Sequence, residues 1–187
     1  AIFNNAIIML DTETSKKSAE HGHANHIVAF TISIRSKRKN ICTLYGNKPT
    51  EAVKCLNKIL NAMQGDKTIV YIHNLSYDWV FLRLFLMEEY GSPIKQLNTK
   101  PHYPIVIEFA NGLILKDSYI LAQKSLERWA KDMDVEHKKA VGKWDYDIIR
   151  NQNTPLDADE LEYIENDTLA GVECIDKTME TLHKKIY

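Results

Sequence analysis

The chain has 187 residues, of which 44% are hydrophobic and 26% charged, a profile that excludes intrinsic disorder and fits one globular domain. Its net charge of −1 excludes a generally basic nucleic-acid-binding protein and leaves only local patches for such contacts. No apolar run approaches the roughly 20 residues that span a bilayer, so no membrane partner is expected. The three cysteines have no metal-ligand spacing, which favours reduced thiols and a cytoplasmic location.

The first half of the sequence predicts a β-meander followed by alternating helices and strands. Runs rich in apolar and β-branched residues predict strands over residues 6–10, 26–35, 41–45 and 68–73. Thr50 is the expected N-cap of a helix that continues to Met63, with its apolar residues on one face. A second helix is expected from Tyr77 to Tyr90, because Gly91 and the proline that follows soon after end it.

The second half predicts a hairpin and two further helices. Asn111-Gly112 lies between the β-rich runs 105–109 and 113–116, which is a strong hairpin signal. A short helix is expected over 125–133, and Asp157 with Glu160 forms the capping-box start of a long last helix. The order β-β-β-α-β-α-β-β-α-α predicts an α/β fold with a mixed sheet and helices on its faces.

Two carboxylates leave the end of the first predicted strand together. Asp11 and Glu13 are two residues apart, and side chains at this spacing share one face of a strand. Burying two like charges is costly unless a cation neutralises them, and hard oxygen ligands suit Mg²⁺ or Mn²⁺. The alternative is a solvated strand end followed by a polar loop.

Two further acidic positions are candidates for the same chemistry. Asp78 follows a buried strand and begins an apolar helix, although an acidic residue in a first helical turn is favoured by the helix dipole alone. Tyr163 and Asp167 are four residues apart on the last predicted helix and share one face with Ala170 and Cys174. The small residues on that face indicate that it is covered, whereas the alternative is an exposed Tyr–Asp pair.

The three motifs together resemble those of the DEDD superfamily of 3′–5′ exonucleases, in its tyrosine-bearing subgroup, whose fold is ribonuclease H-like. The motifs are Asp11-Thr12-Glu13-Thr14, Asn74-Leu75-Ser76-Tyr77-Asp78 and Tyr163-Ile164-Glu165-Asn166-Asp167. The segment His73–Asp78 is also similar to one in protein-primed family B DNA polymerases of small phages and linear plasmids. The same holds for Asp117-Ser118 with the later Ser125–Asp132, and for Lys143 followed by Tyr146.

The resemblance implies a single 3′–5′ exonuclease domain over residues 1–187, as a piece of a longer DNA polymerase that it proofreads. It implies two divalent metal ions, Mg²⁺ or Mn²⁺, that assist hydrolysis of the last phosphodiester at a single-stranded DNA 3′ end. Asp11 would bridge the ions, Glu13 and Asp167 would complete one site, and Asp78 would support the other. Tyr163 would orient the attacking water, and Lys143 would offset charge on the phosphate.

The resemblance also implies DNA contacts and partners. The implied DNA-binding residues are Thr14, His73, Asn74, Leu75, Tyr77, Ser118 and Tyr119. Further partners would be the polymerase domain and a terminal (priming) protein, in the cytoplasm of a bacterial host cell if a phage encodes the chain. From the residues alone, Leu75 and Tyr77 read as core residues, Lys143 equally well as a solvated lysine, and the trio His21, His23 and His26 weakly as a zinc site.

Two other functions stay open at the level of the sequence. One is a catalytically silent module of the same fold that binds a primer strand or a priming protein. The other is a ribonuclease of this fold, since contacts to a 2′-hydroxyl cannot be read from the sequence.

Overall fold

A computed structural model describes residues 5–15 and 25–186, and their side chains as far as His183. Its strands are β1 (Ile7–Thr14), β2 (Ile27–Ser36), β3 (Lys39–Gly46), β4 (Thr68–Ile72), β5 (Lys95–Lys100), β6 (Tyr103–Glu108) and β7 (Leu113–Asp117). Its helices are α1 (Pro49–Ala62), α2 (Leu75–Tyr90), α3 (Tyr119–Ala122), α4 (Leu126–Met133) and α5 (Ala158–Ile186). Within the described residues, no helix combines the length and the apolar composition needed to cross a bilayer.

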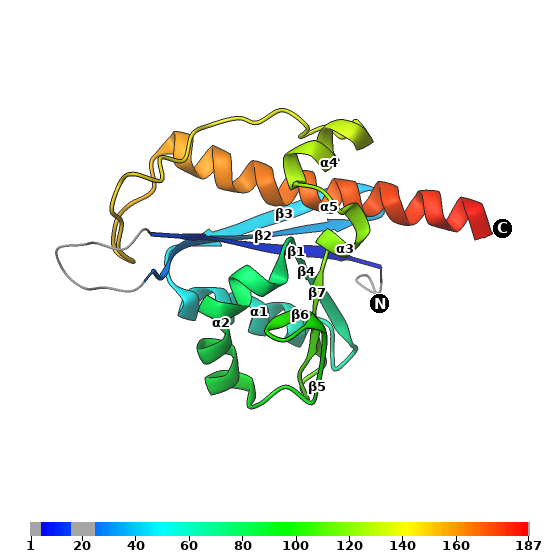
Figure 1. Ribbon diagram of the computed structural model, residues 1–187, viewed down its shortest axis with the longest axis horizontal. Coiled ribbons are helices and arrows are strands. Elements are labelled where there is room, and N and C mark those ends of the chain that lie inside the picture. Colours follow the sequence, from blue (N-terminus) through cyan, green and yellow to red (C-terminus); the bar gives the residue numbers. More distant parts are fainter. Residues whose placement is uncertain (1–4, 16–24, 187) are drawn as a thin grey trace.

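The strands form one mixed sheet in the order β3-β2-β1-β4-β7-β6-β5, with helices on both of its faces (Figure 1). The α/β fold expected from the sequence is therefore confirmed. Antiparallel pairing joins β1, β2 and β3 into the predicted meander, and β6 pairs with β7 as the predicted hairpin. The strands β1, β4 and β7 are parallel neighbours, so their carboxyl ends meet at one edge of the sheet, where open α/β sheets bind ligands.

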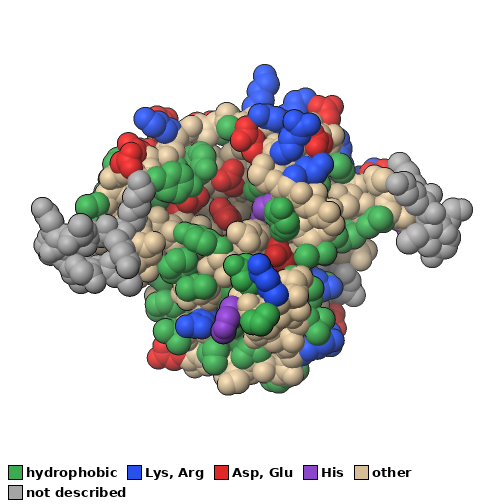
Figure 2. Space-filling view, viewed as in Figure 1, with side chains coloured by type: hydrophobic (Ala, Val, Ile, Leu, Met, Phe, Trp, Pro, Cys, Tyr) green, Lys and Arg blue, Asp and Glu red, His purple; other side chains and the backbone are tan. Residues whose placement is uncertain are grey.

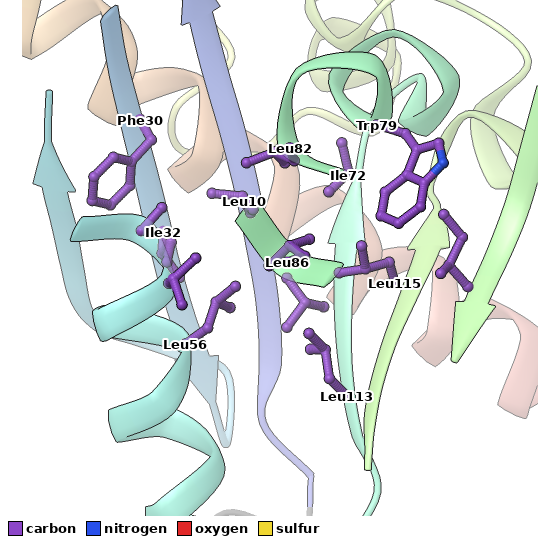
Figure 3. Close-up of a cluster of buried hydrophobic side chains, with 14 of the residues drawn as sticks. Leu10, Phe30, Ile32, Leu56, Ile72, Trp79, Leu82, Leu86, Leu113 and Leu115 are labelled. Atoms are coloured by element: carbon purple, nitrogen blue, oxygen red, sulfur yellow. The ribbon is translucent and has the colours of Figure 1, made fainter. Parts of the chain in front are cut away.

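One face of the sheet packs against α1 and α2 in the main hydrophobic core (Figure 3). Leu10, Ile32 and Ile72 point from the strands toward Leu56 of α1 and Leu82 of α2, and all five are at most 2% exposed. Because protein interiors are close-packed, these contacts fix where α2 begins relative to β1 and β4. The first turn of α2 is thereby held beside the carboxyl end of β1.

The other face of the sheet is covered by α5, with α4 packed on α5 (Figure 1). On this helix, Ile164, Val172 and Ile175 are buried. Helix and strand approach closely at Gly171, where an added Cβ would lie 1.9 Å from Met9 Sδ. A larger residue at position 171 would require the buried Met9 side chain to shift, and this close approach brings the preceding turn of α5, with Asp167, against the end of β1.

Four local features differ from the sequence-based expectations or were missed. The N-cap of α1 is Lys48 and not Thr50, because Pro49 occupies the first helical position and Glu51 Oε2 accepts from the Lys48 N–H at 3.1 Å. The helix α2 starts at Leu75, two residues before the expected Tyr77. The strand β5 and the one-turn helix α3 were not predicted, since β5 is exposed along its whole length and α3 has only four residues.

Candidate active site

A cavity of about 300 Å³ lies at the carboxyl ends of β1 and β4, with further walls from α2, α4, α5 and the loop before α5. Figure 2 shows acidic side chains recessed in a hollow of the surface, with hydrophobic side chains beside them. The cavity is lined by Asp11, Thr12, Glu13, Thr14, His73, Asn74, Tyr77, Asp78, Leu126, Tyr146, Tyr163 and Asp167. The three acidic motifs of the sequence therefore meet in one place.

Three carboxylates form the centre of this cavity. Asp11 and Glu13 project from the end of β1, and Asp167 projects from α5 across the sheet face. One carboxylate oxygen of each lies within 4.8 Å of the corresponding oxygens of the other two. Glu13 is 7% exposed, and the other two are partly buried, so the like charges are held close together with limited access of water.

The fourth carboxylate, Asp78, lines the same cavity and is hydrogen-bonded to Thr12, the residue between Asp11 and Glu13. Thr12 Oγ1 donates to Asp78 Oδ1 at 2.5 Å, and this bond joins β1 to the first turn of α2. Asp78 is 3% exposed and interacts electrostatically with Asp11 and Glu13. It therefore belongs to the same charged site, one hydrogen bond away from the strand that carries the first two acids.

Burial raises the pKa values of all four carboxyl groups, and at Asp11 and Glu13 the charges of the other acids raise them further. Desolvation, followed by the charge of Asp167, raises the pKa of Glu13 to about 8. Desolvation raises the pKa of Asp78 to about 7 and, with the charge of Glu127, that of Asp167 to about 6. The pKa of Asp11 lies well above its ordinary value because of burial and the charges of Glu13, Asp78 and Asp167.

This donor set fits divalent metal ions. Buried carboxylates in mutual repulsion need a cation to remain ionised, and an all-oxygen set matches the preference of Mg²⁺ and Mn²⁺. The three clustered acids, Asp11, Glu13 and Asp167, could hold such an ion. Asp78 offers a further carboxylate on the same cavity wall.

Two tyrosines stand over the carboxylates. The Tyr163 side chain lies on α5 one turn before Asp167, and burial together with the charge of Asp167 raises its pKa to about 12. Tyr146 comes from the loop between α4 and α5, and its hydroxyl donates to Glu13 Oε2 at 3.3 Å. The side chains of the two tyrosines also interact with each other. Both tyrosines are protonated at neutral pH and act as neutral hydrogen-bonding groups.

The structure places Tyr146, and not the Lys143 side chain, at the cavity wall. The family resemblance implied a role for Lys143 and included Tyr146 only as the aromatic residue that follows it. The Lys143 side chain is exposed and does not line the cavity, and its backbone N–H donates to Asp159 O at 3.2 Å. Tyr146 lines the cavity and contacts an acid directly. The only signal in the sequence that could have identified Tyr146 was its position, three residues after Lys143.

Some of the residues expected to bind DNA line the cavity, and the others are buried or pack beside those that do. Thr14, Asn74 and Tyr77 line the cavity, and the Thr14 and Tyr77 hydroxyls are 2.7 Å apart. The Tyr77 side chain is 48% exposed, so its ring is available to a ligand. Leu75, in contrast, is fully buried in the main core and takes the packing role that its residue type alone suggested.

His73 connects the rim to the end of β7. Its Nδ1 lies 3.0 Å from Ser118 Oγ, its Nε2 lies 3.0 Å from Lys124 O, and its ring packs against Tyr119. Ser118 is fully buried, whereas Tyr119 is 43% exposed. Asp117 Oδ1 accepts from the N–H groups of Asn74 and Tyr119, both at 2.9 Å, and so fixes both segments.

The weak zinc alternative concerned a trio of histidines before β2. His21 and His23 lie outside the described residues, and His26 lies just before β2.

The fold, but not the sequence, matches known proteins. No protein-family model matches the sequence, and no match was found among curated proteins. The structure is similar to phi29 DNA polymerase complexed with single-stranded DNA, with a TM-score of 0.74 and 19% identity. It is similar, at 17% identity, to the same polymerase in a ternary complex with primer-template DNA and incoming nucleotides and in a post-translocation binary complex, with TM-scores of 0.74 and 0.75.

These likenesses cover 95–96% of this chain and 31–32% of the polymerase, so the chain spans about a third of that protein's length. At 17–19% identity they establish the fold. The expected ribonuclease H-like fold, and the expected structural likeness to a DNA polymerase, are confirmed at that level.

Proposed function

We propose that this chain is a metal-dependent 3′–5′ exonuclease that removes nucleotides from a single-stranded DNA 3′ end, as the proofreading module of a protein-primed DNA polymerase. The observation that carries the proposal is the buried cluster of Asp11, Glu13 and Asp167, with Asp78 beside it. Isolated buried like charges are costly to a fold, so their retention indicates a ligand that needs them. The similarity to a polymerase solved with DNA supports nucleic acid as the substrate.

In this function, Asp11, Glu13, Asp78 and Asp167 would hold two divalent ions. Such ions lower the pKa of a bound water and stabilise charge on the oxygens of an in-line displacement at phosphorus. Tyr163 is protonated at neutral pH, so it orients the attacking water by hydrogen bonding and does not remove its proton. Tyr146 donates to Glu13 and restricts the orientation of that carboxylate.

The DNA strand would enter along the cavity rim. Tyr77 presents an exposed ring on which a base can stack, and Thr14 and Asn74 present polar groups at the cavity wall. Tyr119, whose ring packs at a tilt against that of His73, forms an exposed aromatic surface on the side of β7. Lys143 is exposed on the loop that carries Tyr146, and its proposed role in offsetting phosphate charge requires its side chain to turn toward a bound strand.

The function is tested with a 5′-labelled single-stranded DNA in Mg²⁺ or Mn²⁺. We expect stepwise shortening that stops with EDTA, with a blocked 3′ terminus and in the Asp11→Asn variant. The matched control is Asp176→Asn, which removes a carboxylate of α5 that is paired with Arg35 outside the cavity. Shortening that persists in Asp11→Asn would contradict the proposal.

The same assay separates the other candidate functions. Metal-independent binding of the strand without any release of nucleotides would indicate a silent binding module. Preferential shortening of an RNA strand of the same sequence would indicate a ribonuclease.

A further inference from the structure

The loop between α4 and α5 brings Tyr146 to the cavity, and one buried side chain anchors that loop. Arg150 is charged but only 4% exposed. An arginine is rarely buried this deeply unless it is paired. Its Nε donates to Glu160 Oε1 at 3.0 Å, and its Nη2 pairs with the same oxygen. Glu160 belongs to the first turn of α5, so this ion pair ties the loop to the helix that carries Tyr163 and Asp167.

The same guanidinium also holds the loop internally. Its Nη1 donates to Asp145 O at 2.6 Å and to Ile148 O at 3.3 Å, on both sides of Tyr146 in the sequence. Its Cζ lies 4.2 Å from the centre of the Trp144 ring, a cation–π contact with a residue that is itself buried. The backbone on both sides of Tyr146 is therefore held by one planar group.

A third connection reaches the strand that carries the first two acids. The backbone N–H of Arg150, rather than its guanidinium, donates to Ser15 Oγ at 3.2 Å, and Ser15 directly follows β1. The charge of Arg150 also acts on Glu13 in the direction that favours its ionised form. Arg150 thus connects α5, the loop and the end of β1 around the contact between Tyr146 and Glu13.

We propose that Arg150 is a positioning residue that fixes the 144–150 loop so that the Tyr146 hydroxyl meets Glu13 in the active site. The inference rests on the proposed nuclease function for its catalytic consequence, but not for its structural part. A planar guanidinium with five donors can serve Glu160 and two carbonyls at once, whereas a lysine ammonium cannot reproduce this geometry. Arg150 does not line the cavity, so it acts on the site through Tyr146.

The first test compares variants of the ion pair. Arg150→Gln leaves Glu160 buried without its partner and risks misfolding, so Arg150→Gln/Glu160→Gln is included to remove both charges. We expect the double variant and Arg150→Lys to lose about 10- to 100-fold in kcat, with KM for single-stranded DNA little changed. The control Arg35→Gln breaks a comparable ion pair to Asp176 at the opposite end of β2, and it should retain kcat. A change in KM alone would overturn the proposal.

A double-mutant cycle with Tyr146→Phe separates positioning from a general loss of stability. If Arg150 acts through the Tyr146 hydroxyl, adding the Arg150/Glu160 change to Tyr146→Phe should lower kcat little further. Losses that multiply instead would show that Arg150 acts independently of Tyr146, and would overturn the proposal.

Hydrogen exchange of the metal-free protein provides a readout that does not require activity. We expect faster amide exchange across 144–150 in Arg150→Gln/Glu160→Gln, and no change there in Arg35→Gln. If wild-type protein releases no nucleotides but this exchange result holds, the proposed function fails and the anchoring of the loop stands. If wild-type protein is active but exchange across the loop is unchanged in the double variant, the role of Arg150 fails and the nuclease function stands.

Discussion

Thr12 Oγ1 donates a hydrogen bond of 2.5 Å to Asp78 Oδ1, so the residue between the two acids of β1 holds the acid of α2. The side chain of Thr12 is 6% exposed, and that of Asp78 is 3% exposed. This bond favours the ionised form of a carboxylate whose burial raises its pKa to about 7. The threonine therefore contributes to the site although it offers no charge of its own.

Thr12→Val should reduce nuclease activity without removing any carboxylate. Valine has nearly the same shape as threonine but cannot donate, so Asp78 loses its orientation and its neutral form becomes more favourable. We expect a loss of about 10- to 100-fold in activity, which is typical when a group that orients a metal ligand is removed. Steady-state kinetics over a range of Mn²⁺ concentrations measures this change. Thr12→Ser, which keeps the hydroxyl, should retain most activity, and equal losses in both variants would contradict the role of the hydrogen bond.

Neutralising Asp167 should abolish activity and stabilise the metal-free protein. Asp167→Asn removes one of the charges that repel each other in the cluster, and burial raises the pKa of Asp167 to about 6 in the native state. We expect the free energy of unfolding in EDTA at pH 8 to increase by about 1–3 kcal/mol, on the scale of 1.4 kcal/mol per pKa unit. Urea denaturation measures it. A variant that is both inactive and less stable in EDTA would argue that Asp167 has a structural role.

The stability of the metal-free protein should fall as the pH rises from 5 to 9. The folded-state pKa values of Asp167, Asp78 and Glu13, about 6, 7 and 8, lie above their ordinary values. Raised acid pKa values favour folding where the groups are protonated, so this contribution is full below about pH 4 and is lost as the pH passes through 6 to 8. Thermal unfolding in EDTA measures the decline.

Saturating Mn²⁺ should reverse this trend, because metal binding requires deprotonated carboxylates and is therefore stronger at high pH. Tm should then increase from pH 5 to 8. The same decline with and without Mn²⁺ would indicate that the cluster does not bind the ion.

Tyr77→Ala should weaken DNA binding more than it affects chemistry. The exposed ring stands at the rim, and loss of base stacking on an aromatic ring costs about 1–3 kcal/mol, or roughly 5- to 150-fold in affinity for a single strand. Fluorescence anisotropy with a labelled oligonucleotide in Ca²⁺ or EDTA measures affinity. Val80→Ala is the matched control, because Val80 is also exposed on α2 but does not line the cavity. Equal effects of the two substitutions would contradict a specific role for the ring.

The elements that bear the acids were predictable because each has a local signal. The apolar run before Asp11 predicts β1, and the reciprocal contacts of Asp157 and Glu160, at 2.8 and 3.1 Å, confirm the predicted start of α5. Ser125 likewise caps α4 by accepting from the Arg128 N–H. Such signals act within one turn or one strand, and the motifs lie directly on them.

The remainder of the site depends on contacts that no local pattern encodes. The segment between α4 and α5 has no periodicity, so nothing in the sequence showed that Tyr146 rather than Lys143 turns toward Glu13. The early start of α2 decides that Leu75 faces the core while Tyr77 faces the cavity rim. Both outcomes follow from tertiary packing, which overrides residue-type preferences at individual positions.

The close approach of Gly171 to Met9 makes the cluster a marker of completed folding. Two of its carboxylates come from the first strand, and the third enters only when the last helix docks on that strand. Bringing such distant segments together requires closure of the long loop between them, which costs conformational entropy. A chain in which α5 has not docked holds Asp11 and Glu13 without Asp167, so in the proposed function high-affinity metal binding would require the native packing of α5. The proposed reactive centre is therefore complete only in a chain whose first strand and last helix have come together.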